Sequence, residues 1–360
     1  MPSNLASASR KDAPASTSRR GTRRAAGLAL LLAALAVAVG LSLAFGSRPI
    51  PLDHVYGEIA TALAAGAHPE LLDPASDAYI IAQLRIPRTA LAILVGAALG
   101  VAGTLIQGHT RNPLADPSLL GISAGAAFAV VLVGAAIGPS SMWVTMLVAF
   151  GGALAATALV FALTTASGGA KNPMTIILGG AALAAVLQAL TSAIVLLDND
   201  SLNRLRFWVV GSVAGHGLEV TAAVAPVIAV ALAAGLATTR QLNLLSLGDD
   251  VASSLGVNTT LSRWLGMLLI AVLAAAATAA AGPIAFVGLM VPHLARALTG
   301  PDYRWIAAYS ALAGAAVLLL ADVVGRVIAR PGELQVGITL AFVGAPFMLW
   351  LLSKRKLVRL

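Results

Sequence analysis

Ten apolar runs, each about as long as a bilayer is thick, constrain this chain more than any other feature. A transmembrane helix needs ~20 mostly apolar residues. In lipid, every backbone polar group must be hydrogen-bonded within the chain, so such runs favour α-helices. The runs are Ala25–Phe45, Ile86–Gln107, Ser118–Ile137, Met142–Thr165, Pro173–Leu197, Leu218–Thr238, Leu261–Ala281, Ile284–Thr299, Trp305–Gly325 and Glu333–Leu352. The sequence therefore predicts an all-α polytopic membrane protein with about ten transmembrane helices.

The composition agrees with a membrane protein. Of the 360 residues, 59% are hydrophobic and 11% are charged, whereas a soluble domain carries about 25% charged residues. The net charge of +8 could attract nucleic acid, but the position of the cations indicates membrane topology instead. The absence of cysteine excludes disulfides, thiolate metal sites and cysteine nucleophiles.

The distribution of lysine and arginine sets the expected orientation. With both termini in the cytoplasm, sixteen of the 23 basic residues lie inside, as the positive-inside rule requires. This orientation predicts a disordered cytoplasmic basic tail (1–24), a transmembrane domain (25–353) whose loop 240–260 is cytoplasmic, and a second cytoplasmic basic tail (354–360). The chain is thus expected in the cytoplasmic membrane, in contact with lipid. The outside basic residues are Arg48, Arg85, Arg88, Arg204, Arg206, Arg326 and Arg330.

These outer residues are all arginines beside apolar runs, and two interpretations are open. Arginine can snorkel, with its stem along apolar surface and its head in water. Alternatively, the arginines form a docking surface for an acidic partner, because a guanidinium pairs bidentately with a carboxylate. Asp322 lies four residues before Arg326, so the two can pair on one helix face.

Small residues and scarce charge characterise the spans. Gly96 to Gly100 and Gly134 to Gly138 have the spacing that lets helices approach closely. Proton- or sodium-coupled carriers usually place ionisable groups at mid-membrane, and their scarcity here argues against a coupled secondary transporter. No phosphate-binding loop of the G-x-x-x-x-G-K-[ST] type occurs. The chain is therefore expected to be no enzyme, with an energy source elsewhere.

One segment, Gly282 to His293, interrupts an apolar region with Gly282-Pro283 and Pro292. Proline removes a backbone donor and breaks a regular helix. Irregular backbone persists at membrane depth only where protein or a water-filled cavity surrounds it. The segment therefore indicates either a lining of a transport path or a kink with no transport role.

Four segments together resemble the FecCD family of permeases, which serve ABC importers for iron–siderophore complexes, haem and vitamin B12. The similarity covers nearly the whole chain after the N-terminal tail, and its specificity lies in all four segments occurring in order. The segments are Leu84-Arg85-Ile86-Pro87-Arg88 through Gly96–Gly100 to Gln107; Asn112-Pro113-Leu114-Ala115-Asp116-Pro117 with Leu120-Gly121-Ile122-Ser123 and Gly125-Ala126; Gly282–Leu289 with Val291-Pro292-His293 and Arg296; and Ala321-Asp322 to Arg326 with Glu333-Leu334, Gly337 and Gly344–Phe347.

The resemblance implies a mechanism and partners. Such permeases pair two ten-helix subunits, dock on a cytoplasmic ABC ATPase dimer and receive cargo from an extracytoplasmic substrate-binding protein. By matching residues, it implies docking roles for Arg85, Arg88 and Arg326 and a cytoplasmic gate at Asn112 and Leu114. It implies ATPase coupling at Leu247, Gly248, Asp249, Leu255 and Gly256. No cofactor or metal is expected on this chain, because ATP and magnesium belong to the ATPase.

Alternatives remain beside these assignments. Leu247-Gly248 and Leu255-Gly256 flank a helix-sized piece that begins near Asp249, but the loop could be a solvated connector. Asn112-Pro113 ends a span, since the residue before proline leaves the helical region, and it could be a simple turn. The sequence predicts a permease for a ferric siderophore, with haem or cobalamin, or a secondary transporter, as alternatives. It leaves a homodimer and a heterodimer both open.

Overall fold

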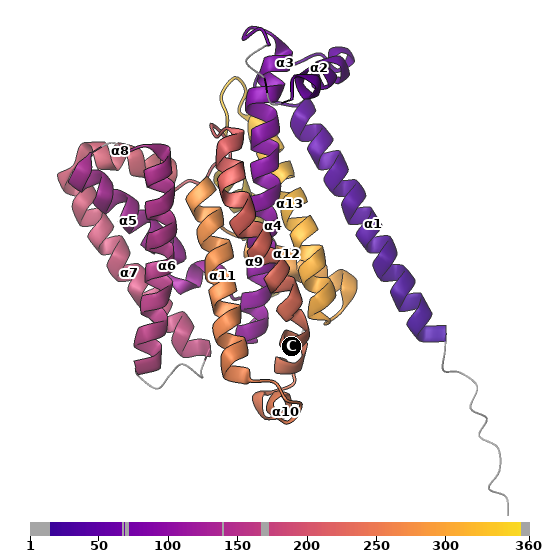
Figure 1. The fold of residues 1–360 in the computed structure, drawn as a ribbon, viewed down its shortest axis with the longest axis vertical. Helices are drawn as coiled ribbons and strands as arrows, with labels where there is room; N and C mark the ends of the chain where they lie inside the picture. Colours follow the sequence, from indigo (N-terminus) through magenta and orange to yellow (C-terminus); the bar gives the residue numbers. More distant parts are fainter. Residues whose placement is uncertain (1–14, 67, 69–71, 139, 167–172, 354–360) are drawn as a thin grey trace, which may run out of the picture.

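The chain forms a nearly all-helical bundle in the computed structural model, which describes residues 15–66, 68, 72–138, 140–166 and 173–353 (Figure 1). Residues 1–14 of the expected tail 1–24, the expected tail 354–360, and Lys171 of the predicted inside set lie outside these described residues. The elements are α1 (Ala15–Ala44), α2 (Leu52–Ala65), α3 (Asp77–Ile80), the π-helical turn η2 (Ile81–Arg85), α4 (Ile86–Thr110), the 3₁₀ turn η3 (Pro117–Leu120), α5 (Ile122–Ile137), α6 (Met142–Ala166), α7 (Pro173–Leu197), α8 (Asn199–Trp208), α9 (Leu218–Leu245), α10 (Asp249–Ser254), α11 (Thr259–Ala281), α12 (Val287–Thr299), α13 (Tyr303–Ile328) and α14 (Val336–Ser353).

Each of the ten predicted spans corresponds to one helix of the described chain, namely α1, α4, α5, α6, α7, α9, α11, α12, α13 and α14. Seven helical stretches in the described residues are long and apolar enough to cross a membrane, and α5 and α14 are shorter apolar helices. The predicted fold class is therefore confirmed.

The predicted disorder of the N-terminal tail is wrong for residues 15–24, which belong to α1. Alanine and arginine are strong helix formers, so the helix continues from the apolar run into the polar segment. Arg24 also anchors this end, because its Nη2 donates to the carbonyl oxygen of Thr299 at 3.2 Å and its guanidinium lies over the ring of Trp305. The structured part thus begins earlier than composition indicates.

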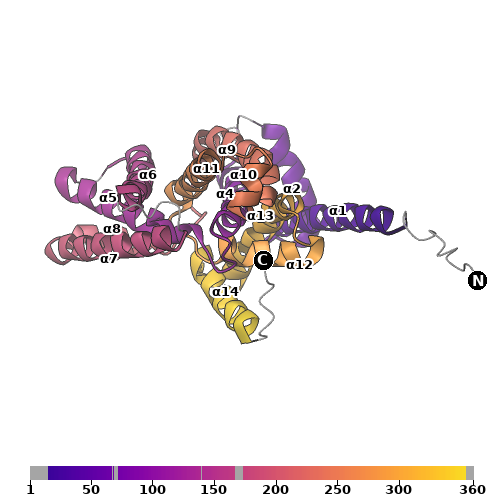
Figure 2. The same cartoon turned by 90° about the horizontal axis from the view of Figure 1, so that it is seen from below.

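Helix α4 lies at the centre of the bundle, and most of its residues are buried. Helices α9, α11, α12 and α13 pack around it, while α5, α6, α7 and α8 form a second group beside α11 (Figures 1 and 2). Helix α1 packs along α13 at the periphery of the bundle. A residue at either end of α4 is therefore well placed to connect several helices.

Glycine allows α4 and α13 to touch backbone to backbone. A Cβ added at Gly96 would lie 2.4 Å from the carbonyl oxygen of Gly314, and one at Gly100 would lie 2.2 Å from that of Ser310. The close approach predicted from the Gly96–Gly100 spacing is confirmed. The same prediction is wrong at Gly138, which ends α5 and has no atom within 4 Å of such a Cβ.

The irregular segment after α11 is only partly buried, with Gly282 buried and Ala285 exposed. Gly282 and Phe286 adopt positive φ angles of 70° and 69°, and α12 starts only at Val287. Pro292 cannot donate to the carbonyl oxygen of Gly288. The side chain of Gln107 on α4 donates instead to the carbonyl oxygens of Gly288 at 3.4 Å and Leu289 at 3.2 Å. A neighbouring helix thereby replaces the lost backbone bond, as the membrane interior requires.

The two ends of the bundle carry different elements. Helices α2, α3 and α8 lie at the upper end in Figure 1, whereas α10 and the start of α1 lie at the lower end. The polar segments predicted outside, Gly46–Gln83 and Asp198–Gly217, therefore share one end of the molecule. Below, the end with α2, α3 and α8 is called the outer end and the end with α10 the inner end.

Candidate functional site

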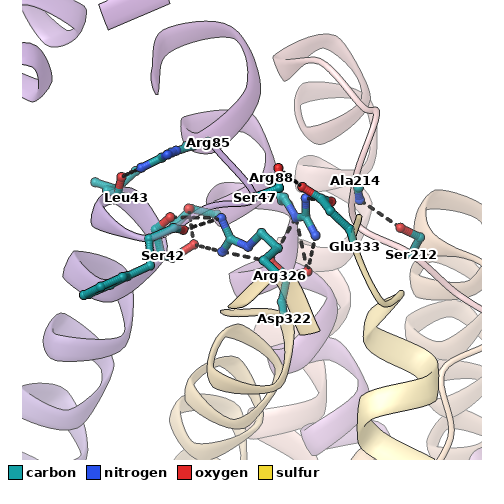
Figure 3. A network of polar contacts seen from close by, with 12 residues as sticks. Ser42, Leu43, Ser47, Arg85, Arg88, Ser212, Ala214, Asp322, Arg326 and Glu333 are labelled. Carbon is teal, nitrogen blue, oxygen red and sulfur yellow. Dashed lines mark hydrogen bonds and ion pairs between the residues drawn. The ribbon is translucent and has the colours of Figure 1, made fainter. Parts of the chain in front are cut away.

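At the outer end, Asp322 is shared by two arginines, Arg88 and Arg326 (Figure 3). Arg88 of α4 donates to Asp322 of α13 through two nitrogens, with Nε to Oδ2 at 2.9 Å and Nη2 to Oδ1 at 2.7 Å. Arg326, one turn after Asp322, lies 3.0 Å from the other side of the same carboxylate. The same-helix pair predicted from the sequence is confirmed. Asp322 and Arg326 are almost fully buried.

The outer end of α1 is capped by arginines from other elements. A helix C-terminus presents carbonyl groups without helical partners and a partial negative charge, which favour nearby cations. Arg85 is 3% exposed and donates three bonds of 2.7, 2.8 and 2.8 Å to this end. The acceptors are the carbonyl oxygens of Leu43, Ala44 and Arg48 for Arg85, Ser42 and Phe45 for Arg326, and Gly46 for Arg330.

The π-helical turn η2 sets the directions in which Arg85 and Arg88 point. Helix α3 passes through η2 into α4 without a break, and Pro87 lies in the first turn of α4, where its missing N–H costs little. The wider π turn places Arg85 towards α1 while Arg88 faces α13. The backbone around Pro87 is thus helical.

Glu333 completes the cluster from the segment before α14. Its Oε2 accepts from Nη1 of Arg88 at 2.6 Å, and its Oε1 accepts from Ser47 at 2.8 Å. Burial alone would raise the pKa of Glu333, but hydrogen bonds from Arg88 and Ser47 outweigh it and hold the pKa below its ordinary value. The carboxylate therefore stays charged beside the arginines.

A pocket of about 410 Å³ opens in this cluster. Its walls include Arg48, Arg85, Arg88, Arg326 and Glu333. The four arginines of these walls have three carboxylate partners, since Asp77 pairs with Arg48, Asp322 with Arg88 and Arg326, and Glu333 with Arg88. The excess positive charge makes the pocket suitable for a further anion.

The three predicted docking arginines therefore lie together, but their setting differs from the one expected. A docking surface is expected to expose its arginines, whereas all three are less than 10% exposed and already hydrogen-bonded within the chain. The snorkelling interpretation is wrong for these three, since none extends its head to water. Their docking role stays a prediction.

The inner end carries the helix predicted for ATPase coupling. Helix α10 begins at Asp249, as predicted, and Gly248 and Gly256 at its flanks adopt φ angles of 113° and 82°. Leu247 is 61% and Leu255 58% exposed, so two large apolar side chains face outward at this end. Exposed apolar groups on a polar loop are typical of a contact surface.

A second shared aspartate lies at this end. Asp249 of α10 accepts from Nη2 of Arg111 at 2.5 Å and from Nη2 of Arg263 of α11 at 2.7 Å. Arg111 also donates to the carbonyl oxygen of Leu245, the last residue of α9, at 2.5 and 3.1 Å. Arg111 and Asp249 are 38% and 40% exposed. Arg111 was not among the predicted coupling residues.

Arg111 occupies a backbone position that normally belongs to glycine. It follows the last residue of α4 with φ 49° and ψ 30°, in the left-handed region. Its N–H bonds to the carbonyl oxygen of Gly108, and that of Asn112 bonds to Gln107, which is the Schellman pattern. A side chain there costs about 1–2 kcal/mol. This chain has an arginine at the position despite this cost.

The predicted gate residues form a turn beside Arg111. The side-chain oxygen of Asn112 accepts from the backbone N–H of Leu114 at 2.9 Å, and both residues are half-buried. This geometry is the simple turn considered as the alternative. It does not test whether the turn narrows a path. Among the described residues, no group of three or more histidine, aspartate or glutamate side chains is placed to hold a metal ion.

The fold and the two polar ends define the class, a multi-pass helical membrane protein with an arginine-lined pocket opposite a short, partly apolar helix. Comparison with known proteins specifies it further. The FecCD transport family matches residues 33–354. The ferric enterobactin transport system permease protein FepD of Escherichia coli (strain K12) is 43% identical over 90% of this chain and 94% of its own length.

Two further similarities extend this result. The cobalamin import system permease protein BtuC of Halobacterium salinarum is 38% identical over 90% of this chain and 87% of its own. The solved structure of a metal-chelate type ABC transporter in an inward-facing conformation matches with a TM-score of 0.78 and 30% identity, over 91% of this chain and 98% of its own. The chain therefore belongs to the FecCD transport family, whose members are transmembrane permease subunits of ABC importers in the cell membrane.

Proposed function

We propose that this permease carries a ferric siderophore across the cytoplasmic membrane, using ATP hydrolysed by a partner ATPase dimer. The observation that supports transport is the contrast between the two ends of the molecule. A cationic pocket lies at the outer end, and a short helix flanked by two exposed leucines lies beside a turn at the inner end. The iron cargo is supported by similarity to ferric enterobactin and ferric citrate permeases. A second permease subunit completes the path.

The proposal places α10 and both termini in the cytoplasm. The positive-inside count supports this orientation. In this arrangement, the exposed Leu247 and Leu255 insert into the ATPase, and the turn at Asn112 and Leu114 narrows the inner end of the path. The outer pocket faces the binding protein.

Uptake in a strain that lacks the native gene tests the function. Labelled ferric siderophores, haem and cobalamin are supplied separately, and uptake is measured with the intact chain and with an empty vector. We expect accumulation of a ferric siderophore that depends on ATP. Selective uptake of haem or cobalamin would show that this compound, and not a ferric siderophore, is the cargo. Uptake without the ATPase would indicate a secondary transporter.

Docking of the binding protein is proposed at Arg85, Arg88 and Arg326. A carboxylate that enters the pocket meets an excess of positive charge among buried arginines, where charge pairs are stronger than on an open surface. Arg85 is the sharpest test, because its partners are neutral carbonyl groups. Charge reversal at Arg88 is unsuitable, since it would place a third carboxylate beside Asp322 and Glu333.

We expect Arg85→Gln to weaken association with the cognate binding protein by about tenfold, in the range of a charged interface contact. Arg330→Gln is the matched control, because it also caps α1 and does not line the pocket. Complex formation with purified binding protein measures both. Equal affinities of the Arg85 variant and the wild type would contradict docking at this residue.

For the coupling helix, Leu255→Glu should abolish uptake while the protein still inserts into the membrane. Leu255 is exposed in the permease alone, so a glutamate is tolerated there, but association with the ATPase would bury its charge without a partner. This change is cleaner than Gly256→Trp, because Gly256 has a φ angle of 82° that a side chain would strain. Normal uptake by Leu255→Glu would contradict the coupling role of α10.

For the gate, replacing Asn112 and Leu114 together with alanine should loosen the turn and let ATP hydrolysis run with less transport. The loss of the Asn112 side-chain bond to the N–H of Leu114 is the physical cause. The ratio of ATP hydrolysed to cargo moved in reconstituted vesicles measures the effect. An unchanged ratio would leave the segment a structural turn.

A further inference from the structure

Arg111 joins three pieces of the inner end with one side chain. Its guanidinium bonds to the carbonyl oxygen of Leu245, where α9 ends, and to the carboxylate of Asp249, where α10 begins. It therefore spans the turn that connects these helices. Gly248, inside that turn, has a φ angle of 113° that only glycine adopts freely. The contact therefore connects the start of α10 to the end of α4.

The contact between the inner ends of α4 and α9 is tightly packed, and this packing limits which helices can move. A Cβ added at Gly108 would lie 2.6 Å from Cδ2 of Leu242, so the ends of α4 and α9 are fixed against one another. Helix α10 is less constrained, with only Ala252 buried among its residues. Movement at this end therefore involves α10 more readily than α9.

The backbone of Arg111 continues directly into the proposed gate. Asn112 supplies the second bond of the Schellman pattern and also accepts from the N–H of Leu114. Further along, Asp116 and Pro117 lie against Gly288 of α12, since a Cβ there would be 3.0 Å from Pro117. The turn is thus held at its far end, and Arg111 is its near attachment.

An arginine at this left-handed position indicates a role for its side chain. Glycine would satisfy the same backbone bonds without strain. A residue kept in a strained conformation is grounds for a functional hypothesis when a specific contact depends on it. Here, that contact is the bond to α10.

We infer that Arg111 is a positioning residue that transmits displacement of α10 to the turn at Asn112–Leu114 through its bond to Asp249. The inference rests on the proposed coupling role of α10 and adds the connection between that helix and the gate. A pull on the guanidinium rotates the backbone at Arg111, and the short turn that follows moves with it. Arg263 holds the same carboxylate from α11.

The test replaces Arg111 with glycine in the complete transporter with its ATPase and binding protein. A merely structural arginine predicts lower thermal stability, whereas glycine relieves the strained backbone. We expect an unfolding midpoint equal to or above that of the wild type, ATPase activity retained, and transport per ATP reduced by about tenfold, a typical coupling between sites.

Two further variants sharpen the result. Asp249→Ala removes the acceptor without changing the backbone at residue 111, and it should reduce transport per ATP similarly, with no additional loss when combined with Arg111→Gly. Arg263→Met is the matched control, because the bond between Arg111 and Asp249 remains. It should retain transport per ATP within about twofold, below the usual coupling between sites.

The absence of cysteine in the chain allows a direct measurement of the gate. A spin label on Leu114→Cys should change its spectrum when the ATPase binds nucleotide, and Arg111→Gly should abolish that change. Wild-type coupling in Arg111→Gly, or a lower unfolding midpoint, would overturn the inference. When Arg111→Gly gives either of these results, Leu255→Glu in the same assay shows which proposal fails. Loss of uptake in Leu255→Glu means that only the Arg111 link fails. Normal transport in Leu255→Glu means that the coupling role of α10 and this inference both fail.

Discussion

The two ends of α4 use the same chemistry in different surroundings. At the outer end, Arg88 bonds to Asp322, which is shared with Arg326. At the inner end, Arg111 bonds to Asp249, which is shared with Arg263. The side chain of Asp322 is 1% exposed and that of Asp249 is 40% exposed.

Burial changes what each arrangement can do. Removing one partner from a buried ion pair costs about 3–5 kcal/mol, because a charge is left without compensation. An exposed pair contributes about 0–1 kcal/mol. The outer aspartate therefore fixes α4 against α13, whereas the inner aspartate joins α4 to α10 weakly enough to be rearranged.

The largest expected effect follows directly from this difference. Asp322→Ala should lower the free energy of unfolding by about 3–5 kcal/mol, since Arg88 and Arg326 would stay buried without their shared acceptor. Asp249→Ala, the matched inner change, should cost less than about 1 kcal/mol. Thermal and denaturant unfolding in detergent measures both. Similar losses at the two positions would show that burial does not separate the two ends.

Helix α1 extends the comparison, because an arginine attaches it to the bundle at each end, Arg85 of η2 at the outer end and Arg24 of α1 itself at the inner end. Arg85 donates three bonds to outer carbonyl groups, whereas Arg24 donates one bond of 3.2 Å to Thr299 and lies 3.9 Å from Asp302. Arg85→Met should destabilise α1 by about 2–3 kcal/mol, the usual range for charged hydrogen bonds. Arg24→Met should cost less than about 1 kcal/mol.

Hydrogen exchange of the α1 amides resolves the two ends separately. Faster exchange should be confined to the residues before Gly46 in the Arg85 variant and should be small near Arg24 in the other. If the Arg24 variant loses more protection, the inner contact is the stronger anchor.

The sequence predicts much of this fold because, in lipid, each transmembrane helix is determined largely by its own residues. Each span has to satisfy its own backbone, so its length and composition are readable from a single run of residues. The Asp322–Arg326 pair is similarly local, since four residues make one helical turn. The start of α1 was missed because residues 15–24 are polar but helix-forming.

The contacts that define the two sites are not local. Arg88 and Asp322 are separated by 234 positions, and Arg111 and Asp249 by 138. Spacing along the chain cannot reveal such pairs. The position of Arg111 just before Asn112-Pro113 predicts a helix end, but not which carboxylate its side chain reaches. Glu333 was part of a recognised motif, and its bond to Arg88 required the structure.

Lowering the pH should have a moderate effect on the unfolding midpoint, and this effect should come from Glu333 at the outer end. Its pKa is lowered in the folded protein, so its contribution to stability is present above its ordinary value of 4.5 and is lost as the pH falls through the folded value. The unfolding midpoint should therefore decrease below about pH 4.5. Glu333→Gln should lower the midpoint at neutral pH and flatten this decrease. An unchanged acid profile in that variant would show that Glu333 does not carry the effect.

Salt should produce the smallest effect and should act on the inner end. Raising the ionic strength from ~0.1 to ~1 M shortens the Debye length from about 10 to about 3 Å. The half-exposed bond between Arg111 and Asp249 is open to this screening, while Asp322 is shielded by burial. Transport per ATP in reconstituted vesicles should decrease modestly, by less than about twofold, because direct contacts are screened less than distant charges. The unfolding midpoint should change little over the same range. Asp249→Asn provides the control, since a variant without the inner charge pair should lose the salt dependence of coupling. If that variant responds to salt as strongly as the wild type, the sensitivity comes from another contact, such as the association with the ATPase.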